Sequence, residues 1–96
     1  MKTITIQIGN SDDKLTQREW SNYVREMGDR VARYGGQIHF SGSSSPCAPW
    51  QNCCWVLEVA RDATTSVETL RAQVASVGKL FRQESVAFTV GETEFV

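Results

Sequence analysis

The chain has 96 residues, of which 41% are hydrophobic and 22% are charged, and its formal net charge is -1. This composition is typical of one ordinary globular domain, residues 1–96, with enough apolar side chains for a single core. The near-neutral charge excludes a general polyanion binder, because non-specific binding to nucleic acid depends on an excess of Lys and Arg.

The first predicted element is a strand over residues 2–10. Ile4, Ile6 and Ile8 alternate with polar residues, and this period of two predicts a strand with one buried face. A short polar connection, residues 10–14, follows the strand.

The second predicted element is a helix that begins at Thr16. Thr16 and Glu19 form the T-x-x-E pattern of a capping box. The apolar residues that follow recur at spacings of three and four, which places them on one stripe of the helix: Trp20, Tyr23, Val24, Met27, Val31 and Tyr34. The pair Gly35 and Gly36 predicts the end of this helix.

Two further strands are predicted on either side of a long loop. Residues 37–41 alternate with Ile38 and Phe40 inward and His39 outward, and residues 53–60 alternate with Trp55 on the inner face. The intervening segment and its borders hold all three cysteines and both prolines. Hairpin loops of this length are usually functional or disordered.

The last predicted elements are a second helix and a fourth strand. Thr65 and Glu68 form a second capping box, so Thr65 is the predicted N-cap. The inner stripe of this helix is Val67, Leu70, Val74, Val77 and Phe81. Residues 85–90 alternate as a strand that Gly91 is expected to end.

The order β-α-β-β-α-β predicts an α+β fold of the ferredoxin-like type, a four-stranded antiparallel sheet with two helices on one face. We expect the first and third strands in the centre of the sheet. The other sheet face is predicted to be open and to carry no aromatic ring, which argues against binding of single-stranded RNA. An open face made largely of small, weakly polar residues such as Thr, Ala and Val favours a homodimer or a higher homo-oligomer.

Two polar segments are the candidate binding sites for a ligand or partner. The first is the turn after the first strand, where Asn10, Ser11, Asp12 and Asp13 are predicted to line a polar pocket. The second lies before the third strand, where Trp50 would stack on a ligand and Gln51 and Asn52 would select it by hydrogen bonds. The alternatives are that the first residues are ordinary turn formers and that Trp50 is a lid over the core.

His39 is the single histidine, and it is added to the candidate binding residues. Its alternative role is in a small enzyme, paired with Cys54 on the neighbouring strand as base and nucleophile. The cysteine spacing lacks the C-x2-C pattern of structural zinc sites, so we predict neither a metal nor a cofactor. The sequence favours a protein that is not an enzyme and assigns no catalytic residue.

No apolar stretch reaches the length of a membrane span, and the alternating N-terminal residues do not form a signal peptide. We therefore expect a cytoplasmic protein with reduced cysteines and no membrane partner.

The segments IGNSDDKLTQREW (residues 8–20) and APWQNCCW (residues 48–55) are similar to small uncharacterised proteins of actinobacteria and their phages. The resemblance covers about a third of the chain and carries over no catalytic residue. It implies a phage accessory or counter-defence role, in which the protein binds a host protein or sequesters a small nucleotide-like ligand. The alternatives are the Cys/His enzyme and a structural subunit of a larger particle.

Overall fold

The computed structural model describes residues 1–10, 14–45, 47–48, 50–61 and 65–96. In chain order the elements are β1 (Lys2–Gly9), α1 (Gln17–Tyr34), β2 (Ile38–Ser43), β3 (Asn52–Glu58), α2 (Val67–Leu80) and β4 (Ala87–Glu92). The predicted α+β class, with a four-stranded antiparallel sheet and two helices, is confirmed.

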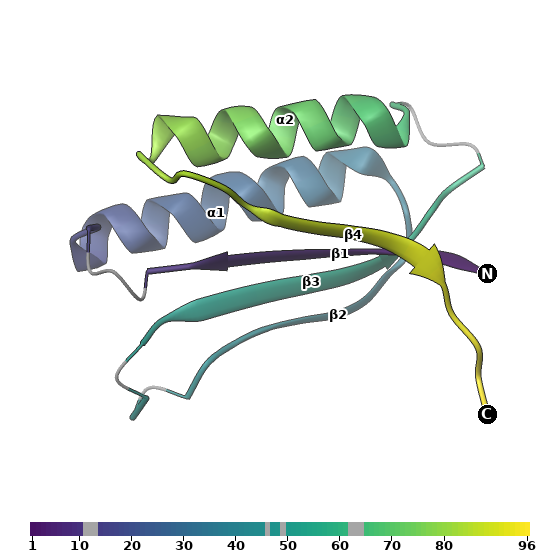
Figure 1. Cartoon of the computed structure of the whole chain (residues 1–96), viewed down its shortest axis with the longest axis horizontal. Helices are drawn as coiled ribbons and strands as arrows, with labels where there is room; N and C mark the ends of the chain where they lie inside the picture. The colour runs from purple at the N-terminus through teal and green to yellow at the C-terminus, as the bar shows by residue number, and fades with distance from the viewer. Residues whose placement is uncertain (11–13, 46, 49, 62–64) are drawn as a thin grey trace.

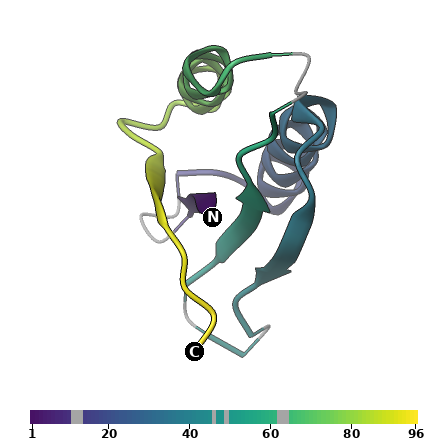
Figure 2. The same ribbon diagram turned by 90° about the vertical axis from the view of Figure 1, so that its right-hand side faces the viewer.

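The strands lie in the order β2-β3-β1-β4, so β1 and β3 occupy the centre and β2 and β4 the edges (Figure 1). All three strand pairs are antiparallel. A view along the strands shows both helices on the same side of the sheet, which leaves the opposite face open (Figure 2). Among the described residues, neither helix combines the length and hydropathy that a membrane span requires.

The core lies between the helices and the covered face of the sheet. The predicted alternation of β1 is confirmed, because Ile4, Ile6 and Ile8 are all buried. Trp55 is also buried, as predicted, and a methyl group at Gly28 in α1 would lie 3.7 Å from its indole ring. The helices complete the same cluster with Trp20, Tyr23, Met27, Val31, Tyr34, Leu70, Val74 and Val77.

The predicted start of α1 is confirmed. Thr16 is the N-cap, and its hydroxyl accepts from the N–H of Glu19 while the Glu19 carboxylate accepts from the N–H of Thr16. This backbone hydrogen bond and the neighbouring Arg82 guanidinium lower the pKa of Glu19. The helix ends at Gly35, whose φ of 87° lies in the left-handed region that glycine adopts without strain.

The predicted N-cap of α2 is wrong by one residue. Ser66, not Thr65, caps the helix, and its hydroxyl accepts from the N–H of Thr69. Both residue types cap helices well, so adjacent Thr and Ser leave the first turn ambiguous in the sequence.

The prediction that Phe40 faces the core is wrong. A register shift between Ile38 and Phe40 adds one residue to β2 and places Phe40 opposite Val56, on the open face. A bulge of this kind reverses the direction of every later side chain in the strand. The side chain of Phe40 is 55% exposed, and Ile38 on the covered side is still 42% exposed because β2 is an edge strand.

The boundaries of β4 also differ from the prediction. The strand extends through Gly91, which lies opposite Thr3, and ends at Glu92. Gly91 has no positive φ, and nothing in the backbone requires the strand to end there. The chain then continues to Phe95, whose ring stacks on His39 at 6.3 Å between ring centroids.

Gly36 has no room for a side chain. A methyl group there would lie 2.2 Å from the backbone carbonyl oxygen of Glu58. Gly36→Ala should therefore lower the free energy of unfolding by about 1–3 kcal/mol through overpacking, measured by urea denaturation. Gly91→Ala is the matched control, because that site has no neighbour within 4 Å. Equal stabilities of the two variants would contradict the close approach of Gly36 to β3.

Candidate functional site

A buried side chain amide fixes the end of the sheet where the predicted binding segments meet. Asn10 follows β1 and is only 4% exposed. Its Oδ1 accepts from the N–H of Leu15 at 3.0 Å, and its Nδ2 donates to the carbonyl oxygen of Leu15 at 3.1 Å. Asn10 therefore closes the turn between β1 and α1 with both ends of its amide.

The same amide holds the loop between β2 and β3. Asn10 Nδ2 donates to Gln51 Oε1 at 3.0 Å, and the backbone N–H of Asn10 donates to the Gln51 carbonyl oxygen at 2.8 Å. Gln51 in turn forms a two-way amide pair with Gln17 on α1, with N–O distances of 3.1 and 2.8 Å. The polar groups of Asn10 and Gln51 thus contact the protein itself.

Ser44 bridges the two ends of the loop. Its hydroxyl donates to the Trp50 carbonyl oxygen at 3.2 Å and accepts from the N–H of Asn52 at 3.1 Å. Its backbone N–H donates to the Asn52 carbonyl oxygen at 2.9 Å. These contacts hold the backbone between the Trp50 carbonyl group and Asn52, and the Trp50 indole is 49% exposed.

Beside Trp50 lies a cleft of about 240 Å³. Its described lining consists of Trp20, Ser43, Ser44, Ser45, Ala48, Trp50, Gln51 and Asn52. Two indoles, three serine residues and two amide side chains therefore surround one small cavity, and none of these side chains is charged. This lining suits a planar, uncharged group that stacks on a ring and accepts or donates hydrogen bonds at its edge.

The structure brings together only part of the predicted binding set. Asn10, Trp50, Gln51 and Asn52 lie at one end of the sheet, where Gly9 is opposite Asn52. Ser11, Asp12 and Asp13 lie outside the described residues. His39 lies at the other end, beside the last residue of β3, where its Nε2 is 3.0 Å from Glu58 Oε1. His39 therefore does not join the other predicted residues.

The predicted pairing of His39 with Cys54 is wrong. Glu58 occupies the hydrogen-bonding position at His39 Nε2, and Cys54 lies opposite Gly42. The β2 bulge that displaces Phe40 also separates these two residues. Burial raises the pKa of the Cys54 thiol. It also raises the pKa of the Cys53 thiol, which is buried in the core. A raised pKa lowers the thiolate fraction on which nucleophilic reactivity depends.

All three cysteines are free thiols. Within the described part of the chain, no group of three or more His, Cys, Asp or Glu side chains gathers in a geometry that could hold a metal ion.

Three parts of this region were not predicted from the sequence. Ser44 and Gln17 hold the loop, and Phe40 adds an aromatic ring to the open face, where none was expected. The first two act through contacts between segments far apart in the chain, which have no local pattern. A G-Q-I-H-F run also gives no sign of a bulge, because it alternates equally well without one.

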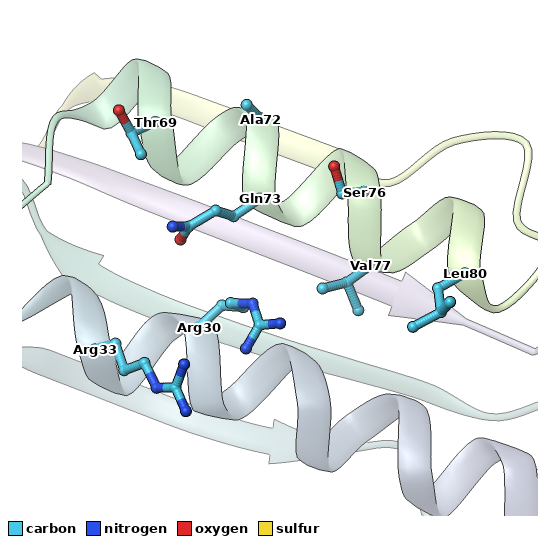
Figure 3. A pocket seen from close by; sticks show the side chains of 8 residues that line it. All are labelled: Arg30, Arg33, Thr69, Ala72, Gln73, Ser76, Val77 and Leu80. Carbon is cyan, nitrogen blue, oxygen red and sulfur yellow. The ribbon is translucent and has the colours of Figure 1, made fainter.

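A larger groove, of about 630 Å³, lies between the two helices (Figure 3). Arg30 and Arg33 of α1 extend along one wall, and Gln73, Val77 and Leu80 of α2 lie along the other. Asp29 Oδ2 accepts from both guanidinium groups, at 3.1 and 3.0 Å. The positive charge of the two arginines is thus partly neutralised by a carboxylate of their own helix. The groove therefore attracts an anion less strongly than two unpaired arginines would.

Comparison with known protein families and with characterised proteins finds no family model and no protein sequence that matches this chain. The function must therefore be argued from the geometry of the chain's own residues.

The buried amide of Asn10 should be essential for stability. Asn10→Ala removes the partners of the N–H and C=O of Leu15 and the amide contact to Gln51. Buried polar groups left without partners cost about 1–3 kcal/mol each, so the free energy of unfolding should fall by at least about 2 kcal/mol. Urea denaturation measures the change. Asn52→Ala, at an exposed side chain, is the matched control, and an equally small loss for both variants would contradict the structural role of Asn10.

The order in which the three thiols are labelled should follow their exposure to solvent, without faster labelling of Cys54 through a pair with His39. Cys47 is exposed, Cys54 half-buried and Cys53 buried, and burial raises the pKa of the last two thiols. We expect Cys47 to react first with a disulfide reagent at pH 8, Cys54 more slowly, and Cys53 only on unfolding. Mass spectrometry of quenched samples gives the order. Fast labelling of Cys54 that His39→Ala abolishes would instead support the enzyme alternative.

Proposed function

We propose that the protein is a non-enzymatic binding module whose cleft beside Trp50 takes a planar, uncharged group such as a nucleobase. The observation that carries this proposal is the half-exposed indole of Trp50, held beside a cleft with no charged side chain in its described lining. Stacking on an aromatic ring supplies affinity for any flat ring system, and the exposed side chain amide of Asn52 can supply selectivity by hydrogen bonds.

The hydrogen bonds on the C-terminal side of Trp50 support this role. Binding costs free energy when backbone and side chains become ordered, so a segment that is held in advance binds more tightly. The contacts of Ser44 and Gln51 hold residues 50–52 without any ligand. A ring that served only as a lid over the core would be largely buried. Trp55, which is a core residue, is almost fully covered, whereas the ring of Trp50 is half-exposed.

The absence of charge in the described lining narrows the ligand class. A phosphate needs cationic side chains or a cluster of free backbone N–H groups. The cleft therefore fits the base of a nucleotide-like ligand better than its phosphates. Its volume of about 240 Å³ lies below the usual range of ligand pockets, which starts at about 300 Å³, and so favours a small group such as a single base.

We also propose that the fold belongs to the ferredoxin-like class. The element order β-α-β-β-α-β and the central position of β1 and β3 support this classification. The phage accessory role implied by the resemblance, and a cytoplasmic location, stay predictions.

Nucleoside titration followed by ¹H–¹⁵N NMR tests the proposal. At least one of adenosine, guanosine, cytidine and uridine should shift the Trp50 indole N–H and the Ser44 and Asn52 amides in a saturable way. Trp50→Ala should weaken binding about 5- to 150-fold, which corresponds to about 1–3 kcal/mol of base stacking. Trp50→Phe should retain most of the affinity.

Phe95→Ala is the matched control, because it removes another exposed ring at the far end of the sheet. It should leave nucleoside affinity unchanged. Two results would overturn the proposal: no nucleoside shifts these signals, or the shifts persist unchanged in a folded Trp50→Ala protein.

A further inference from the structure

The outer edge of β2 is a second surface with unusual properties. Within the part of the chain that the structure describes, no strand pairs with this edge. Natural proteins usually protect such edges with charged residues, prolines or bulges. The β2 sequence IHFSGS contains no charged residue and no proline, and its bulge lies at one end, between Ile38 and Phe40. The regular stretch that follows the bulge has none of these protections.

The backbone of that stretch is directed outward at two positions. Ser44 donates its N–H to Asn52, and Gly42 lies opposite Cys54, so these residues direct their backbone groups toward β3. Backbone groups in an antiparallel pair alternate between the two sides of a strand. The N–H and C=O groups of Ser41 and Ser43 are therefore directed away from the sheet.

From these features we propose that β2 pairs with β2 of a second copy of this chain, antiparallel about a two-fold axis at Gly42. Ser41 of one copy would lie opposite Ser43 of the other, and each such pair would exchange both of its backbone hydrogen bonds. The result is one continuous sheet across two subunits. This inference does not depend on the proposed ligand site at Trp50.

The side chains of the strand fit this self-pairing. The Phe40 ring already covers Gly42, since a methyl group at Gly42 would lie 2.7 Å from Phe40 Cζ. At the two-fold axis the two glycines would face each other, with a phenyl ring from each copy above them on the open face. Such packing would cover Phe40, which is 55% exposed in the single chain.

Charge favours β2 over the other edge for contact between identical chains. No like charges would meet along β2, and the net charge of -1 gives little repulsion between copies. The opposite edge strand, β4, ends in the charged residue Glu92, with Glu94 close behind, and charged side chains on an edge strand oppose its pairing with another chain.

Analytical ultracentrifugation of charge variants tests the proposal. The wild-type chain should dimerise reversibly. The variant Ser41→Lys/Ser43→Lys places like charges opposite one another and should weaken the dimer about tenfold or more. The variant Ser41→Glu/Ser43→Glu should do the same. An equimolar mixture of the two should restore a dimer that contains one chain of each type.

Ser21→Lys/Ser85→Lys is the matched control, because it adds the same charge at exposed positions away from β2. It should dimerise like the wild type, and circular dichroism should show that all variants are folded. A wild-type chain that stays monomeric overturns the proposal. So does a dimer that survives the β2 changes but is lost in Thr5→Lys/Thr89→Lys, since that result places the interface on the open sheet face.

Discussion

The hydrogen bonds of one buried amide, that of Asn10, determine how the end of the sheet beside Trp50 is arranged. A polar side chain at that depth is tolerated only when its donors and acceptors are satisfied. Asn10 meets this requirement with partners from both the turn that begins α1 and the loop that precedes β3. The end of β1, the Leu15 backbone ahead of α1 and Gln51 ahead of β3 are therefore joined by the hydrogen bonds of a single residue.

This arrangement separates residues that hold the backbone beside the cleft from residues left to contact the ligand that we propose. Asn10, Gln51 and Gln17 use their amides on one another, and Ser44 uses its hydroxyl on the loop backbone. The half-exposed ring of Trp50 is left as the main contact surface. His39 lies at the opposite end of the sheet with Glu58 and Phe95, so it belongs to a different surface. The uncharged outer edge of β2 is a third surface, on which we base the proposed self-association.

Regular patterns in the sequence were sufficient to predict most of the scaffold. The alternation of Ile4, Ile6 and Ile8 and the Thr16–Glu19 capping box correspond directly to structure, because each depends on residues close together in the chain. Phe40 was misplaced because a one-residue bulge reverses the strand faces without changing the local pattern. Asn10 and Gln51 were predicted as binding residues from two separate polar segments, and the structure places their amides in contact. Their mutual hydrogen bonds were not foreseen, since a sequence does not show which polar groups satisfy each other.

We propose that the half-exposed Trp50 ring forms a ligand site and is not a lid over the core. Native mass spectrometry of protein purified from the cells that naturally make it, compared with a denatured sample, tests this claim most directly. We predict a mass excess that is lost on denaturation, that corresponds to a compound with a planar ring, and that is missing from folded Trp50→Ala protein. A wild-type mass equal to that of the bare chain, or an excess that Trp50→Ala retains in full, would contradict the claim.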